Sequence, residues 1–129
     1  IRNGGIQAID RIPVHPRRAR NVPEAVRTQL LEDCANLKPE GVASTLQHTN
    51  PFTSIRALAP NNPRPVLLCH GTKERRFADN KAWAQAHMQN LSVVDIDAGH
   101  GVNMEGAADF DRHVCDFIRR HTDNTQAAY

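Results

Sequence analysis

The sequence lacks the long apolar runs and the aromatic clusters that mark membrane proteins and nucleic-acid binders. A membrane-spanning helix needs about 20 consecutive apolar residues, and no segment of the 129-residue chain approaches that length. Aromatic residues are only 5% of the composition, and neither basic cluster, residues 15–20 or 73–77, is interleaved with rings on which bases could stack. With a net charge of only +2, the chain is expected to be soluble and to bind neither membranes nor nucleic acid.

Cysteine is also scarce, and its pattern excludes the common cysteine-based frameworks. Cys34, Cys69 and Cys115 are an odd number with no CxxC spacing, which argues against a disulfide framework. Cys69 and Cys115 lie inside apolar runs, so buried free thiols in a reducing compartment are expected. No group of histidines and carboxylates has the spacing of a metal site, and no segment resembles a secretion signal. We therefore expect no metal, no cofactor, and a cytoplasmic rather than a secreted protein.

The first half of the chain has the features of an irregular arm followed by helices. Residues 1–20 combine glycines and prolines with scattered charges, so they are expected to be irregular or partly ordered. The chain starts at Ile1 rather than Met, from which we expect cleavage of a longer precursor or a fragment prepared in the laboratory. Residues 21–58 are expected to be helical, with Asn21 as a cap. The expected inward residues are Val26, Leu30, Cys34 and Leu37 in the first helix, and Val42 and Leu46 in a second helix from Pro39 to about His48.

The second half, residues 59–122, alternates compact apolar runs with amphipathic segments. This alternation is typical of a parallel β-sheet with helices packed on it, so the fold class is predicted to be α/β. The expected elements are a strand at Val66–Gly71, a helix at Asn80–Asn90, a strand at Ser92–Asp97, a helix from about Glu105 to His121, and a frayed tail over residues 123–129. The expected inward residues are Trp83, Ala86 and His87 in the first helix, and Phe110, Val114, Phe117 and Ile118 in the second.

Two parallel strands do not form a stable sheet by themselves. Each strand is apolar on both faces, and the pair would leave open edges and uncovered apolar surface. Residues 1–65 offer helices and irregular chain rather than further strands. We therefore expect the rest of the sheet to lie in another polypeptide or in a removed upstream segment.

Two polar loops follow the two predicted strands. In a parallel α/β sheet, functional groups gather beyond the carboxyl ends of the strands. The first loop supplies Glu74 and the second supplies His100. A carboxylate that accepts the Nδ1 proton of a histidine orients the ring and leaves Nε2 free as a general base. The two residues are therefore candidates for the acid and the base of a catalytic triad.

The order of these features resembles the C-terminal end of an α/β-hydrolase-fold protein, over about residues 65–120. In that family the last two core strands carry the triad acid and then the triad histidine. The spacing of His100, Asn103 and Glu105 is similar to that in the enol-lactonase and related esterase branch. The resemblance implies that His100 is the catalytic histidine and Glu74 the triad acid, in a place where the family usually has aspartate. It also implies that the helices in residues 21–58 are a cap over the active site, or else a peripheral layer without substrate contact.

Other residues near the predicted site leave alternatives open. Glu74 could instead form a surface ion pair with Arg75 or Arg76. Asp79 is the next candidate for the acid, and some relatives place the acid after an earlier strand. Asp95 and Asp97 are expected to be solvent-facing or loop-capping, and His70 is expected to be structural.

The third member of a triad is missing from this sequence. The only serines are Ser44, Ser54 and Ser92, and none lies in a G-x-S-x-G turn. The loop that would form an oxyanion hole is absent too, so the chain alone is expected to be inert. The expected partner is an N-terminal chain that carries the nucleophile and the oxyanion hole, and the expected substrate is a small acyl compound.

The predicted function is therefore that of the C-terminal chain of a two-chain hydrolase. The bond cleaved would be an ester, lactone, thioester or amide. The same scaffold also supports acyltransferases, enzymes with an aspartate nucleophile, and non-catalytic binding proteins. A chain with no natural two-chain state is a further alternative.

Overall fold

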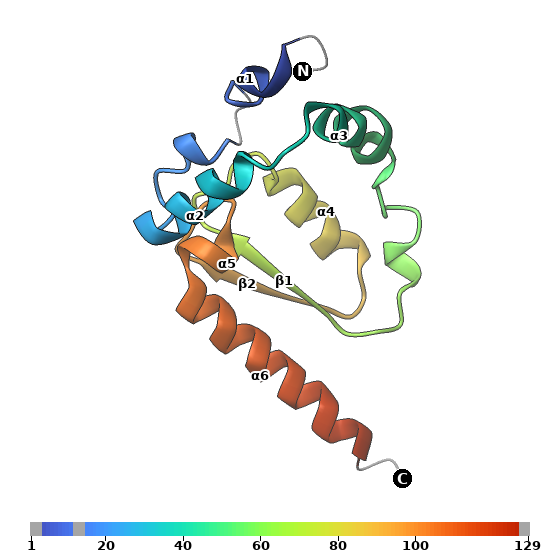
Figure 1. Cartoon of the computed structure of the whole chain (residues 1–129). Helices are drawn as coiled ribbons and strands as arrows, with labels where there is room; N and C mark the ends of the chain where they lie inside the picture. Colours follow the sequence, from blue (N-terminus) through green and yellow to red (C-terminus); the bar gives the residue numbers. More distant parts are fainter. Residues whose placement is uncertain (1–3, 12–14, 127–129) are drawn as a thin grey trace. The chain divides into compact units, whose positions relative to one another are not determined.

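The computed structural model describes residues 4–11 and 15–126. These residues form two compact units, and the division between them falls between Ile55 and Arg56. Figure 1 shows helices in the first unit and both strands in the second. The chain is thus a mixed α/β protein, and the expected parallel pairing of two strands is confirmed.

The N-terminal unit is built from short helical segments. Residues 5–9 are helical, within the arm of residues 1–20 that was expected to be irregular or partly ordered. The run between Gly5 and Ile12 contains no proline that would prevent a helical turn. The described elements are α1 (Gly5–Ile9), the 3-10 turn η1 (Pro16–Arg18), α2 (Glu24–Cys34), α3 (Pro39–Ser44), the π-helical turn η2 (Thr45–Thr49) and the 3-10 turn η3 (Asn50–Phe52).

Helix α2 differs from its prediction at both ends. Asn21 does not cap it, because Pro23 occupies the position before the first helical residue and no side chain caps this end. The helix stops at Cys34, so Leu37 lies beyond it and is exposed. Leu46 is exposed as well, because the chain leaves the α-helical repeat for a π-helical turn at Thr45. The other predicted inward residues, Val26, Leu30, Cys34 and Val42, are half-buried.

The C-terminal unit contains the strand-helix-strand-helix order predicted from the sequence. Its first strand has the predicted bounds, and its last helix continues to Gln126, so residues 123–126 are not a frayed tail. Residues 127–129 lie outside the described part of the chain. The elements are the 3-10 turn η4 (Ala59–Asn61), β1 (Val66–Gly71), α4 (Ala78–His87), β2 (Leu91–Ile96), α5 (Val102–Glu105) and α6 (Ala107–Gln126).

The last helix was expected to begin at about Glu105; it begins at Ala107, and a short helix that was not predicted, α5, precedes it and is separated from it by Gly106. A Cβ atom at this residue would lie 2.6 Å from Cγ2 of Ile96. The absence of a side chain therefore allows the backbone between α5 and α6 to pack directly against the end of β2. This close packing lies at the point where α5 ends and α6 begins.

Strands β1 and β2 pair in parallel, from Val66 opposite Leu91 to Gly71 opposite Ile96. Figure 1 shows α4 and α6 on opposite sides of the two strands. Most strand residues are nevertheless only half-buried, and the buried apolar residues among those described are Val22, Ala59, Ile96 and Ala98. The described residues therefore bury few apolar side chains.

The helices of this unit do not bury all of the predicted residues. In α4, Trp83 is half-buried, but Ala86 and His87 are exposed; Lys81, Ala84 and Met88 are half-buried instead. The His87 ring stacks on Trp83 at a centroid distance of 4.8 Å, which holds it away from the sheet. In α6, Phe110, Val114 and Phe117 are half-buried. Ile118 is 55% exposed, because the second half of α6 runs beyond the two strands (Figure 1).

Replacing Gly71 with alanine is expected to destabilise the chain by about 2–4 kcal/mol. A Cβ atom at Gly71 would overlap the carbonyl oxygen of Gly99 and lie 2.5 Å from that of Ala98. These are backbone atoms, so they cannot move aside without shifting the corner after β2. Urea unfolding followed by circular dichroism measures the effect. The control is Gly41→Ala in α3, where a Cβ atom meets nothing within 4 Å and where a small gain is expected. Equal stability of the two variants would contradict the prediction.

Candidate functional site

The loops that follow β1 and β2 are joined by backbone hydrogen bonds. The N–H of Thr72 donates to the carbonyl of Ile96 at 2.8 Å, and the N–H of Lys73 donates to that of Ala98 at 3.0 Å. The parallel pairing thus continues past the strand ends and holds the two loops side by side. This is the reason that residues 26 positions apart, Glu74 and His100, lie next to each other.

Glu74 and His100 form a direct contact at the carboxyl ends of the strands. The distance between Nδ1 of His100 and Oε2 of Glu74 is 2.8 Å. The Glu74 side chain is only 9% exposed, whereas that of His100 is 67% exposed. The carboxylate therefore lies beneath the imidazole and can hold its Nδ1–H, while the rest of the ring faces outward. The predicted contact is present, and the catalytic roles of the two residues stay predictions.

The second oxygen of Glu74 is fixed by its own loop. Its Oε1 accepts a hydrogen bond from the backbone N–H of Arg76 at 2.6 Å. Burial alone would raise the pKa of Glu74, but this bond, the hydrogen bond with His100 and the nearby positive charge of Arg76 outweigh it. The pKa therefore lies below its usual value of 4.5. The surface ion pair considered as an alternative is not formed among the described contacts, because Glu74 bonds the backbone of Arg76 and the ring of His100.

The His100 ring has one further neighbour, which the sequence analysis missed. Phe77 stacks on it with a centroid distance of 5.1 Å and an interplanar angle of 25°. The guanidinium of Arg76 lies over the Phe77 ring, 5.6 Å from its centroid. Among the described residues, no group bonds Nε2 of His100. The ring is thus held at one nitrogen and one face, and its other nitrogen is available to a reacting group.

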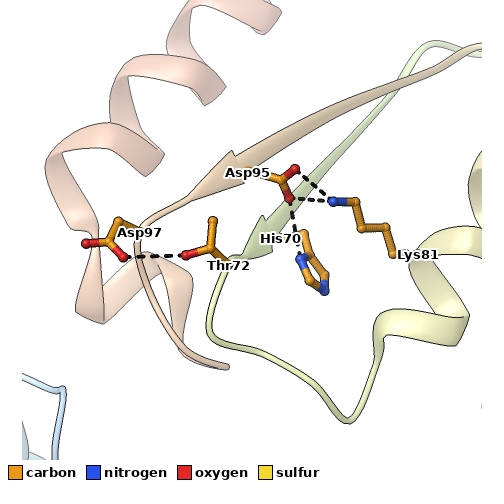
Figure 2. A network of polar contacts seen from close by, with 5 residues as sticks. All are labelled: His70, Thr72, Lys81, Asp95 and Asp97. Carbon is orange, nitrogen blue, oxygen red and sulfur yellow. Dashed lines mark hydrogen bonds and ion pairs between the residues drawn. The ribbon is translucent and has the colours of Figure 1, made fainter.

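The remaining carboxylates near the strand ends do not reach His100. Asp79 lies in the first turn of α4 and is exposed. Asp97 pairs with Nζ of Lys73 at 3.0 Å and contacts the hydroxyl of Thr72 at 3.4 Å, and these contacts lower its pKa. Figure 2 shows that Asp97 points toward Thr72 and away from the network around His70. Glu74 is therefore the candidate acid that the geometry favours.

His70 belongs to a separate network with Asp95 and Lys81 (Figure 2). Asp95 accepts two hydrogen bonds from Nζ of Lys81, at 2.6 and 2.8 Å, and these are the main reason that its pKa is lowered. Nδ1 of His70 lies 3.5 Å from Oδ1 of Asp95, and neither ring nitrogen has a hydrogen-bond partner within the described part of the chain. The His70 side chain is 13% exposed, and Figure 2 shows it on the same side of the strands as Lys81. Asp95 is exposed, as expected, and it also pairs with Lys81 and lies beside His70, which is its partner in the strand register.

Residues 4–11 and 15–126 contain no cluster of three or more histidine, cysteine or acidic side chains that could hold a metal ion. In the same residues, no helix has both the length and the apolar character needed to cross a membrane. Cys34 and Cys69 are half-buried free thiols, and burial raises the pKa of Cys69. Cys115 was expected to be buried, but it is exposed because it lies on the outer side of α6.

Comparison of the chain with protein-family models, with curated protein sequences and with solved structures finds no match.

Proposed function

We propose that this chain supplies the base and the acid of a catalytic triad to a nucleophile on a second chain. The reaction would be hydrolysis of an ester, lactone, thioester or amide. The observation that carries the proposal is the 2.8 Å contact between His100 and Glu74. An exposed imidazole that is hydrogen-bonded at Nδ1 to a nearly buried carboxylate is the arrangement that general-base catalysis requires.

The roles of the two residues follow from the same geometry. Nε2 of His100 would take the proton of the attacking hydroxyl and later return it to the leaving group. Glu74 would keep the neutral ring in the Nδ1–H tautomer and stabilise the imidazolium that forms in the transition state. Its lowered pKa keeps the carboxylate ionised at neutral pH, as this role demands.

The need for a second chain rests on two features of this one. The sequence has no nucleophile elbow, and the described sheet has two strands with open edges and half-buried apolar faces. Strands from a partner would cover those edges, and one of them would bring the nucleophile to Nε2 of His100.

A tagged fluorophosphonate tests this proposal on the assembled protein. We expect it to label one residue of the co-purified partner chain and to block hydrolysis of a p-nitrophenyl ester. His100→Ala should slow the labelling, because the nucleophile loses its base. Peptide mass analysis identifies the labelled residue, and heat-denatured protein is the control. If the protein showed no labelling and no hydrolysis but retained a ligand tightly, the proposal would be contradicted and a binding protein would be favoured.

A further inference from the structure

The side chain of Glu105, at the end of α5, accepts hydrogen bonds from the residues before and after His100. Oε2 of Glu105 accepts the N–H of Gly99 at 2.7 Å, and Oε1 accepts the N–H of Gly101 at 3.2 Å. Both hydrogen bonds are partly buried. The two amides are those immediately before and after the His100 residue, so the carboxylate spans it.

The surrounding backbone is shaped to admit this carboxylate. A Cβ atom at Gly99 would lie 2.8 Å from Oε2 and 3.0 Å from Oε1 of Glu105, closer than side-chain carbons normally approach. A further hydrogen bond joins Glu105 and Gly101 with the donor and acceptor residues exchanged: the backbone N–H of Glu105 donates to the carbonyl of Gly101 at 2.8 Å. Residues 99–101 and α5 therefore form one locked turn.

We infer that Glu105 is the positioning residue that aims the His100 ring at Glu74. The carboxylate fixes the peptide between His100 and Gly101 and the peptide between Ala98 and Gly99, and this limits where the side chain can point. Without it, the exposed ring would be held only by the Glu74 bond and by the stacking on Phe77. The consequence for turnover rests on the function proposed above, whereas the consequence for the ring itself does not.

A carboxylate suits this position better than an amide of the same shape. Two N–H donors converge on the Glu105 side chain, and an ionised carboxylate offers an acceptor oxygen to each. Glutamine would offer one oxygen and turn an NH₂ donor toward the other N–H. Glu105→Gln thus changes little in volume but removes one of the two bonds, so it separates the positioning effect from a packing effect.

The ring ¹⁵N chemical shifts of His100 test the inference directly in the chain. In the wild-type chain we expect the neutral ring to carry its proton on Nδ1, where Glu74 accepts it. In Glu105→Gln, the ring ¹⁵N chemical shifts of His100 should move toward the values of a mixture of the two tautomers. In Glu105→Ala, they should move further in the same direction. The matched control is Asp111→Asn, which removes an exposed carboxylate from α6 that has no described contact. Backbone amide spectra of β2 and α6 show whether each variant is folded.

Turnover in the assembled protein gives the second measurement. A ring displaced by about 1 Å loses roughly 10²-fold in rate, so Glu105→Ala should lower kcat by that factor with little change in KM. Glu105→Gln should lie between it and the wild type. Unchanged His100 tautomers in both folded variants would overturn the inference, even if His100→Ala abolishes turnover. Altered tautomers in a protein without hydrolytic activity would support it while refuting the proposed function.

Discussion

Replacing His100 with alanine is expected to lower kcat of the assembled protein by about 10⁴-fold or more, without loss of folding or assembly. The imidazole is exposed, is held at Nδ1 by the Glu74 carboxylate at 2.8 Å, and has no described bond to Nε2. Because its side chain is 67% exposed, its removal takes little packing away from the chain. The measurement is hydrolysis of a p-nitrophenyl ester, with size-exclusion chromatography to check assembly.

Two further measurements make this variant informative. His87→Ala removes another exposed imidazole, at the end of α4, and should leave turnover within a few-fold of the wild type. The carboxyl pKa of Glu74, followed by ¹³C NMR, should rise in His100→Ala, since the bond and the charge of the imidazole help to lower it. Normal turnover in His100→Ala would refute the catalytic role of this residue.

Glu74→Gln is expected to lower kcat by about 10²–10⁴-fold while leaving KM nearly unchanged. The amide keeps the shape of the side chain but cannot offset the positive charge that His100 gains in the transition state. It can also donate to Nδ1, which favours the wrong tautomer. Steady-state kinetics on the same ester measure the effect.

Two companion variants identify the acid. Glu74→Asp restores the charge but shortens the side chain, so its kcat should lie between those of Glu74→Gln and the wild type. Asp79→Asn tests the other candidate carboxylate, which does not contact His100 and should be dispensable. A larger loss in Asp79→Asn than in Glu74→Gln would transfer the role of the acid to Asp79.

Much of the fold was predictable because its signals are local. An apolar run ended by glycine predicts β1 with its observed bounds, and period-3.6 patterns predict α2, α4 and α6. The inward faces were predicted less well. Ile118 and His87 are exposed, since the burial of a helix residue depends on what the helix packs against, and a two-stranded sheet covers only part of each helix.

The candidate site shows the same division. The order of residues along the chain was enough to select Glu74 and His100, because polar loops after parallel strands meet at one edge of a sheet. Strand register, the bonds from Thr72 and Lys73 to the second loop, and the absence of a side chain at Gly71 are what bring the two residues to 2.8 Å. None of these can be read from spacing alone.

By itself, the sequence determined the α/β alternation, the pair of candidate residues and the absence of a G-x-S-x-G turn from these 129 residues, since each is a matter of residue type and order. Only the tertiary structure decided which carboxylate bonds His100, that Phe77 stacks on its ring, and that Glu105 spans the corner. These are contacts between separate segments, and their geometry depends on how the strand ends and α5 pack. Residue types determine which groups could react, but the packing of the backbone determines how those groups are oriented.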